Sequence, residues 1–313
     1  MQTRRDFVIG GLSVLGAACV RSSDGDPVLT VGVLSDPHVS LQHPERTDLL
    51  KRAFRLVADK GADVVAVVGD MTDTGLVVEL EQFADVWRSL DLHSRLFAVL
   101  GNRDMSVSGK ISHAERLPMA DRAIYPAPAA VWKRVFGEAY DADFLQCEYR
   151  GIRFFGAHWG KERMAAEAFV HGAGRGLDPA VPFLYFQHAP PYGTSFKVMW
   201  EPHHWDPVSE MLSQYSNAIA FSGHTHHSIA DDTVFWRRGF VSIGAGSTWD
   251  AKTCPFCESV KPQSRSQAAI LRLYDSKAVY ERYDVLAGSR MGRSLVWNLP
   301  AGDGLPSGAY PFA

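Results

Sequence analysis

Short apolar runs that end in polar residues constrain the fold of this chain more than any other feature. Three such runs, Val28–Leu34, Val64–Val68 and Phe97–Leu100, are separated by two stretches with helical apolar spacing, Glu45–Lys60 and Leu80–Leu90. The alternation predicts a β-α-β-α-β order and therefore a parallel sheet. Ligands of such sheets gather beyond the carboxyl ends of the strands. The residues directly after each run are thus the first candidates for a functional site.

Later apolar runs predict a second sheet. The further predicted strands are Phe144–Tyr149, Ile152–Ala157, Phe183–Gln187, Ile219–Ser222, Phe240–Ile243, Ala268–Tyr274 and Ala278–Tyr283. A polar turn, YDSKA, joins the last two. Since 46% of the residues are hydrophobic, the chain can bury a full core. We therefore expect an α/β fold of two packed mixed β-sheets flanked by helices, a four-layer α-β-β-α sandwich.

One domain spanning residues 28–313 accounts for these elements. Residues 105–143 have no clear strand period, and we expect an insertion there that could cap the site. Residues 285–313 are expected to form a C-terminal tail ending in Gly/Pro-rich sequence. The net charge is -3 and no run of Lys and Arg is present, so no nucleic-acid polymer is expected as a partner.

The N-terminal stretch TRRDFVIGGLSVLGAACV has the features of an export signal. Arg4 and Arg5 precede an apolar stretch, Phe7–Val20, that is too short to cross a bilayer as a helix. The arrangement resembles a twin-arginine export signal. We expect residues 1–18 to be the signal peptide and 19–27 a linker, with Cys19 as a candidate site for a lipid anchor. The resemblance implies the twin-arginine export machinery as a partner and an extracytoplasmic location, in the periplasm or at the cell surface.

Residues suited to metal binding follow several of the predicted strands. These residues are Asp36, His38, Asp70, Asn102, His188, His224 and His226. Carboxylate, amide and imidazole ligands in this mixture suit manganese, iron or zinc better than calcium. A carboxylate shared by two such metals would hold them about 3.5–4 Å apart, as in two-metal hydrolases. The sequence therefore predicts a site for two divalent or trivalent metal ions.

The blocks DPH, GDMTD, GNRD, QHAPP and GHTH resemble the signature blocks of the calcineurin-like metallophosphoesterases. The resemblance implies that Asp36, His38 and His226 bind one metal, and that Asn102, His188 and His224 bind the other. Asp70 would bridge both metals. A hydroxide between the metals would then attack phosphorus in line. Thr72 and Asp73, in GDMTD, are candidates for orienting that loop.

Arg103 departs from the family pattern, which usually has His after the Asn. Arginine cannot act as a general acid, but it can hold a phosphoryl group by two hydrogen bonds. Asn102, Arg103 and Asp104 are the expected catalytic residues, and Asp104 either pairs with Arg103 or caps the next segment. The expected function is hydrolysis of phosphoester or phosphoanhydride bonds in small phosphorylated substrates with good leaving groups.

The sequence is also compatible with two alternative functions. One is a phosphomonoesterase or cyclic-nucleotide phosphodiesterase that recruits another acid, such as His158, His203 or His204. The other is a catalytically weak protein that binds phosphate or metal.

Two further stretches have more than one interpretation. MWEPHHWDP could line the substrate mouth with Trp200, His203 and His204, or it could be an ordinary packed loop. Cys254 and Cys257 form a CxxC, which could be a loop disulfide, a reduced pair or a redox motif.

Overall fold

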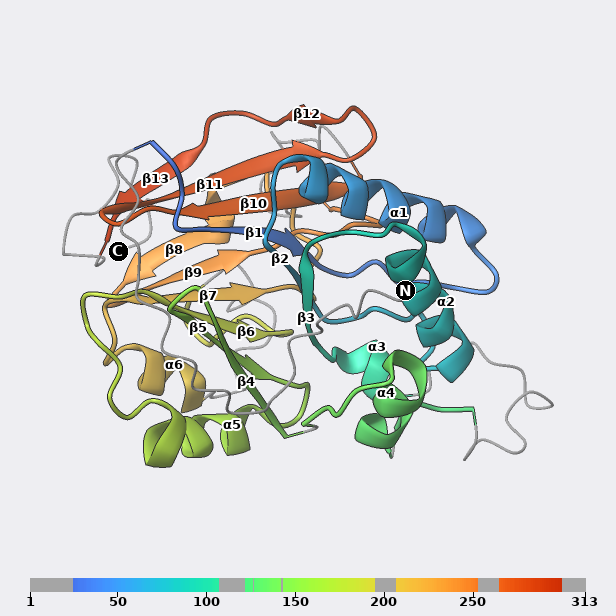
Figure 1. The fold of residues 1–313 in the computed structure, drawn as a ribbon, viewed down its shortest axis with the longest axis horizontal. Coiled ribbons are helices and arrows are strands. Elements are labelled where there is room, and N and C mark those ends of the chain that lie inside the picture. The colour runs from blue at the N-terminus through green and yellow to red at the C-terminus, as the bar shows by residue number, and fades with distance from the viewer. Residues whose placement is uncertain are drawn as a thin grey trace.

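The computed structural model describes residues 25–106, 122–125, 127–141, 143–194, 207–252 and 265–299. These residues form two β-sheets with helices outside them (Figure 1). The first sheet has the order β12-β11-β10-β1-β2-β3, and β13 pairs with β11. The second has the order β4-β5-β6-β7-β9-β8.

The first sheet is built from both ends of the chain. Its strands are β1 (Leu29–Leu34), β2 (Val64–Val68), β3 (Arg95–Val99), β10 (Gln267–Leu273), β11 (Lys277–Asp284), β12 (Ser289–Arg290) and β13 (Leu295–Asn298). The β1, β2 and β3 strands are parallel, as the alternating pattern predicts, whereas β10 runs antiparallel to β1. All residues of β1 and β2 are buried, which is why each appears in the sequence as a continuous apolar run.

The second sheet comes from the middle of the chain. Its strands are β4 (Phe144–Tyr149), β5 (Ile152–Ala157), β6 (Phe183–Gln187), β7 (Ala218–Ser222), β8 (Phe235–Arg238) and β9 (Phe240–Gly244). β5, β6, β7 and β9 are parallel, while β4 and β8 pair antiparallel at the two edges. Both sheets are therefore mixed, and the predicted fold is confirmed.

Aromatic side chains from the two sheets form the core between them. Phe97 on β3 lies 5.6 Å, between ring centroids, from Phe154 on β5 and 5.1 Å from Phe186 on β6. Phe221 on β7 lies 6.1 Å from Tyr280 on β11. This packing fixes how the carboxyl ends of the strands from one sheet face those of the other.

Helices cover the outer faces of the two sheets (Figure 1). On the first sheet these are α1 (Pro44–Asp59), α2 (Val77–Ser89) and α4 (Pro128–Phe136), the last packed on α2. On the second sheet they are α5 (Glu162–Ala168), which continues as a π-helical turn at Phe169–Ala173, and α6 (Pro207–Leu212). The short α3 (Asn102–Met105) follows β3, and a 3-10 turn at Asp232–Val234 precedes β8. No helix in the described ranges is both long and apolar enough to cross a membrane.

Several short elements differ from the sequence prediction. The stretch expected as a tail from residue 285 contributes β12 and β13 to the first sheet as far as Leu299. Within the expected cap, 105–143, the described part packs α4 against α2. The strands β8, β12 and β13 have two to four residues each, too few to establish a period of two. Residues 1–24, 107–121 and 300–313 lie outside the described part of the chain.

Candidate metal centre

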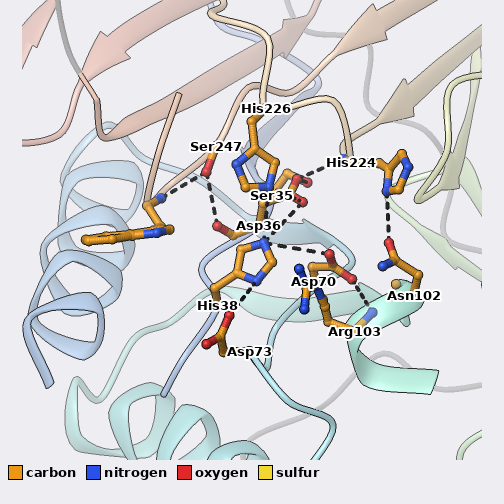
Figure 2. A network of polar contacts seen from close by, with 12 residues as sticks. Ser35, Asp36, His38, Asp70, Asp73, Asn102, Arg103, His224, His226 and Ser247 are labelled. Carbon is orange, nitrogen blue, oxygen red and sulfur yellow. Dashed lines mark hydrogen bonds and ion pairs between the residues drawn. The ribbon is translucent and has the colours of Figure 1, made fainter. Parts of the chain in front are cut away.

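Most of the predicted metal ligands lie on backbone in the left-handed region. Five of the seven have φ angles between 46° and 66°: Asp36, His38, Asp70, His224 and His226. Among the other described residues that are not glycine, only Asp91 and Arg150 have positive φ. Such backbone is rare for L-residues and clusters at functional sites. The loops after β1, β2 and β7 are bent so that these side chains share one space (Figure 2).

Asp36, His38 and His226 form a first group, whose ligand atoms lie within 4.8 Å of one another. His226 Nε2 lies 3.1 Å from Asp36 Oδ1 and 3.1 Å from His38 Nε2. Asp36 Oδ1 is buried and accepts no hydrogen bond. A buried anionic oxygen that faces imidazole nitrogens but lacks a donor fits a bound cation.

Asp70, His188 and His224 form a second group with the same property. Asn102 belongs with it, because its Oδ1 lies 2.8 Å from His224 Nδ1 and 3.1 Å from His188 Nε2. Asp70 faces both groups, since its Oδ1 is 3.3 Å from His188 Nε2 and its Oδ2 is 3.7 Å from His38 Nε2. The structure therefore brings all seven predicted ligands together and places Asp70 between the groups.

The charges of the two carboxylates dominate the electrostatics of the site. Burial lowers the pKa of His188, but the charges of Asp70 and Asp36 outweigh burial and raise that pKa to about 9. Burial likewise lowers the pKa of His38, but the nearby carboxylates of Asp36, Asp73 and Asp70 outweigh burial and raise that pKa to about 9. Burial raises the pKa of Asp36, yet His226 and His188 hold it well below its usual value. The cluster therefore stabilises positive charge, which is what a pair of metal ions would supply.

Backbone carbonyls orient two of the imidazoles. His188 Nδ1 lies 2.8 Å from Val68 O, and His226 Nδ1 lies 3.0 Å from Asp250 O. A carbonyl can only accept, so each Nδ1 carries a proton, and in the neutral imidazole, the form that binds a metal, Nε2 has its lone pair toward the cluster. This is the tautomer that a metal-binding imidazole needs.

Glycines at the ends of the strands allow the loops to approach closely. A Cβ on Gly101 would lie 2.2 Å from Asp70 Oδ1, and one on Gly223 would lie 1.9 Å from Ser35 Oγ. Ser35 Oγ in turn donates to Asp36 Oδ2, which also accepts from His224 N. The glycines of GNRD and GHTH are therefore required by close packing around the carboxylates.

Arg103 and Asp104 have different surroundings. The half-buried Arg103 side chain is directed toward the cluster in Figure 2, while its backbone N–H donates to Asp70 Oδ1 at 2.8 Å. Within the described ranges its guanidinium makes no hydrogen bond or ion pair. Asp104 is fully buried and accepts hydrogen bonds from Gly101 N, Met71 N, Thr72 N and Thr72 Oγ1. Asp104 therefore caps α3, the short helix that contains it, and not the segment that follows, and it makes no ion pair with Arg103 among the described residues. These contacts favour positioning over substrate contact.

His158 does not have the surroundings of an alternative acid. It is fully buried, accepts from Leu100 N at Nδ1 and lies 2.9 Å from Asp141 O at Nε2. Burial lowers its pKa to about 4, so the imidazole is neutral near neutral pH. The expectation that His158 could protonate a leaving group is therefore wrong. No local pattern in the sequence indicates this, because both partners, Leu100 and Asp141, lie in other loops of the chain.

Trp159 is an aromatic residue that the structure places against the second group of ligands. Its ring centroid lies 5.0 Å from that of His224 and 5.9 Å from that of His188. By contrast, Trp200, His203 and His204 lie outside the described residues, as do Cys254 and Cys257. Cys147 is a free thiol whose pKa is raised by burial.

Comparison with known proteins establishes the family. Residues 29–228 match the family described as calcineurin-like phosphoesterase. This chain belongs to that family. The match covers the strand ends that supply all seven candidate ligands, and as a calcineurin-like metallophosphoesterase the chain has two candidate metal positions in the groups above. No curated protein matches the sequence.

Solved structures share the fold at low sequence identity. A dimetal phosphatase from Danio rerio is 13% identical with a TM-score of 0.52, and the match covers 87% of this chain and 99% of that one. The purple acid phosphatase PPD1 from yellow lupin (Lupinus luteus) seeds is 12% identical with a TM-score of 0.54, covering 86% of this chain and 53% of that one. GAP50, described as the anchor in the inner membrane complex of Plasmodium, is 12% identical with a TM-score of 0.50, covering 86% and 88%.

Proposed function

We propose that this protein is a two-metal hydrolase of phosphoesters or phosphoanhydrides that favours substrates with good leaving groups. The observation that carries the proposal is the position of the Arg103 side chain next to the ligand cluster. A guanidinium lies there without a partner among the described residues, directed toward the space in front of Asp70 (Figure 2). The family assignment supports the phosphoesterase class, and Arg103 supports the preference for substrates with good leaving groups.

The donor set fits two ions of manganese, iron or zinc. Asp36, His38 and His226 would hold one ion, Asn102, His188 and His224 the other, and Asp70 both. Bound metals of this kind lower the pKa of water toward neutrality and neutralise phosphoryl charge. Asp36 Oδ1, which is buried without a hydrogen-bond donor, supports this occupancy.

Arg103 can bind and orient the phosphoryl group but cannot protonate the leaving oxygen. Its guanidinium stays charged at all relevant pH values and offers paired donors to phosphoryl oxygens. An alkoxide leaving group is roughly as basic as hydroxide, with a pKa near 15.7, whereas a phosphate leaves with a pKa of about 6. Phosphoanhydrides and activated aryl esters therefore need no proton from the protein, whereas alkyl monoesters do.

Leaving-group dependence tests this proposal. Rates of the metal-loaded protein on a series of aryl and alkyl phosphates, plotted as log rate against leaving-group pKa, should give a steep negative slope. Arg103→His should flatten the slope and raise alkyl-ester rates selectively, because a general acid contributes about 10²–10⁴-fold and helps poor leaving groups most. Arg103→Ala should lower all rates without flattening the slope.

Other results would support the alternatives. A shallow slope in the unmodified protein would indicate a separate general acid, such as His203 or His204, and a monoesterase or cyclic-nucleotide phosphodiesterase. Two bound metals with phosphate binding and no turnover would indicate a binding protein.

We also propose that the chain is exported through a twin-arginine pathway and acts outside the cytoplasm. The support is the sequence of residues 1–18, with Arg4 and Arg5 ahead of a short apolar stretch. Cys19 would then be the first residue after cleavage and a candidate for lipidation. Export in the folded state would allow metals to be loaded before the chain crosses the membrane.

A further inference from the structure

His38 has a polar partner on each side of its ring. Its Nε2 faces the ligand cluster, 3.7 Å from both Asp36 Oδ1 and Asp70 Oδ2. Its Nδ1 faces away and lies 3.5 Å from Asp73 Oδ1 (Figure 2). His38 Nδ1 is buried and makes no hydrogen bond among the described residues. When Nε2 binds a metal, the ring proton must sit on Nδ1, and Asp73 Oδ1 is the carboxylate oxygen that faces it.

Arg46 holds Asp73 and the backbone of His38 together. Its Nη1 lies 3.0 Å from Asp73 Oδ1 and donates to His38 O at 3.3 Å. The side chains of Arg46 and Asp73 are each only 8% exposed, so solvent screens this pair little. The guanidinium carbon also lies 4.4 Å from the ring centroid of Trp249, a cation–π contact that fixes the plane of the fork.

The segment that carries Trp249, residues 245–252 after β9, also contacts the other two ligands of the first group. Ser247 Oγ accepts from Trp249 N and Asp250 N and donates to Asp36 O at 3.2 Å. Asp250 O lies 3.0 Å from His226 Nδ1. The segment 245–252 thus reaches Asp36, His226 and, through Trp249 and Arg46, His38.

The second group is supported differently. His188 is oriented by Val68 O, Asp70 by the N–H of Arg103, and the backbone of His224 by Asp36 Oδ2. These contacts come from the strand-end loops and the ligands themselves, without Arg46, Asp73 or Trp249. Contacts from Arg46, Asp73 and the segment 245–252 therefore orient the ligands of the first group, whereas strand-end loops orient those of the second.

We propose that Arg46, Asp73 and Trp249 are positioning residues that set the affinity of the first metal position selectively. They hold His38 in the tautomer and orientation in which Nε2 points at the metal. This inference rests on the proposed two-metal function. It assigns a role to Trp249, which is distant in sequence from every motif block.

Zinc titration of the metal-free full-length chain tests the proposal by calorimetry. Two binding events should appear, and His38→Ala and His224→Ala should identify the first and second positions. Asp73→Ala and Trp249→Ala should weaken the event lost in His38→Ala by about 10–100-fold and leave the other unchanged. Asp73→Asn keeps an oxygen acceptor and Trp249→Phe keeps a ring face, so both should recover most of the affinity.

Controls separate positioning from general damage to the fold. Trp236→Ala removes a partly buried tryptophan that packs on Phe240 in the second sheet, and should leave both zinc events unchanged. Thermal unfolding of each metal-free variant shows whether it folds. If Asp73→Ala does not fold, Trp249→Ala still tests the proposal, because the Trp249 side chain is only half-buried and its removal disturbs the core less.

Two results would overturn the proposal. Equal weakening of both events in a folded variant, or no weakening of either, means that these side chains do not act selectively on the first position. Fewer than two zinc ions bound by the unmodified chain would instead refute the two-metal function itself. The two failures are thus distinguishable.

Discussion

Replacing Asp104 by alanine should destabilise the fold strongly, because four buried donors lose their acceptor at once. Asp104 Oδ2 accepts from Gly101 N at 2.8 Å and Met71 N at 3.2 Å. Asp104 Oδ1 accepts from Thr72 N at 2.9 Å and Thr72 Oγ1 at 2.8 Å. These bonds tie the turn that carries Asn102 and Arg103 to the loop that carries Asp70.

The magnitude follows from these donors and the space that is vacated. A buried group that loses its partner costs about 1–3 kcal/mol, so four groups set an upper bound of roughly 4–12 kcal/mol. The removed carboxylate leaves a polar space that can admit a water molecule and satisfy some of the donors. We therefore expect Asp104→Ala to lower the free energy of unfolding by about 3–5 kcal/mol. Asp104→Asn keeps one oxygen acceptor and should lose roughly half as much.

Urea unfolding in the presence of a chelator measures this free energy without a contribution from metal binding. The midpoint should fall while the slope with denaturant stays constant. If Asp104→Ala unfolds within about 1 kcal/mol of the unmodified chain but loses turnover, the positioning role is wrong. Asp104 would then act in the chemistry.

Two further predictions follow from particular contacts, and a third follows from the N-terminal sequence. Gly101→Ala should destabilise the fold by about 1–3 kcal/mol and weaken metal binding, because its Cβ would lie 2.2 Å from Asp70 Oδ1. Gly172→Ala, with open space at its Cβ, is the matched control; equal behaviour of the two variants in urea unfolding would contradict the steric argument. Burial lowers the pKa of His158 from 6.5 to about 4, so the unfolded chain takes up this proton first as the pH falls. His158 should therefore contribute at most about 3 kcal/mol to the free energy of unfolding above about pH 6.5, and this contribution should be lost toward pH 4. The free energy of unfolding of His158→Gln should lack that part of the pH dependence. Lysine at both positions 4 and 5 should leave the protein in the cytoplasm on cell fractionation, and unchanged export would show that the arginine pair is not recognised.

Much of the fold could be predicted because the buried strands are continuous apolar runs. β1 and β2 are buried at every position, and their runs are visible without any partner. β13 is a contrasting case, since Leu295–Asn298 becomes a strand by pairing with β11. A four-residue segment has too little periodicity to predict its state alone. The same holds for the short helices α5 and α6.

The set of candidate ligands could be predicted from the sequence, but the contacts that hold those ligands in place could not. Each ligand follows an apolar run, so its place at a strand end is a local property of the sequence. The contact between Arg46 and Trp249 joins α1 to the segment after β9, and no local pattern indicates it. Likewise, His158 looks like any histidine after a strand until its burial and its partners Leu100 and Asp141 are known.

The sequence by itself determined which segments become the longer strands and which polar residues end them, because both follow from hydrophobic periodicity over a few residues. It also determined that Arg103 stands where the family usually has histidine. Only the tertiary structure decided which of these strand ends meet. His38 and His226 are separated by 188 residues, and their nitrogens come within 3.1 Å because the two sheets pack with their strand ends together. The left-handed backbone of Asp36, Asp70 and their neighbours is likewise a product of that packing, since only a folded environment can hold such strain.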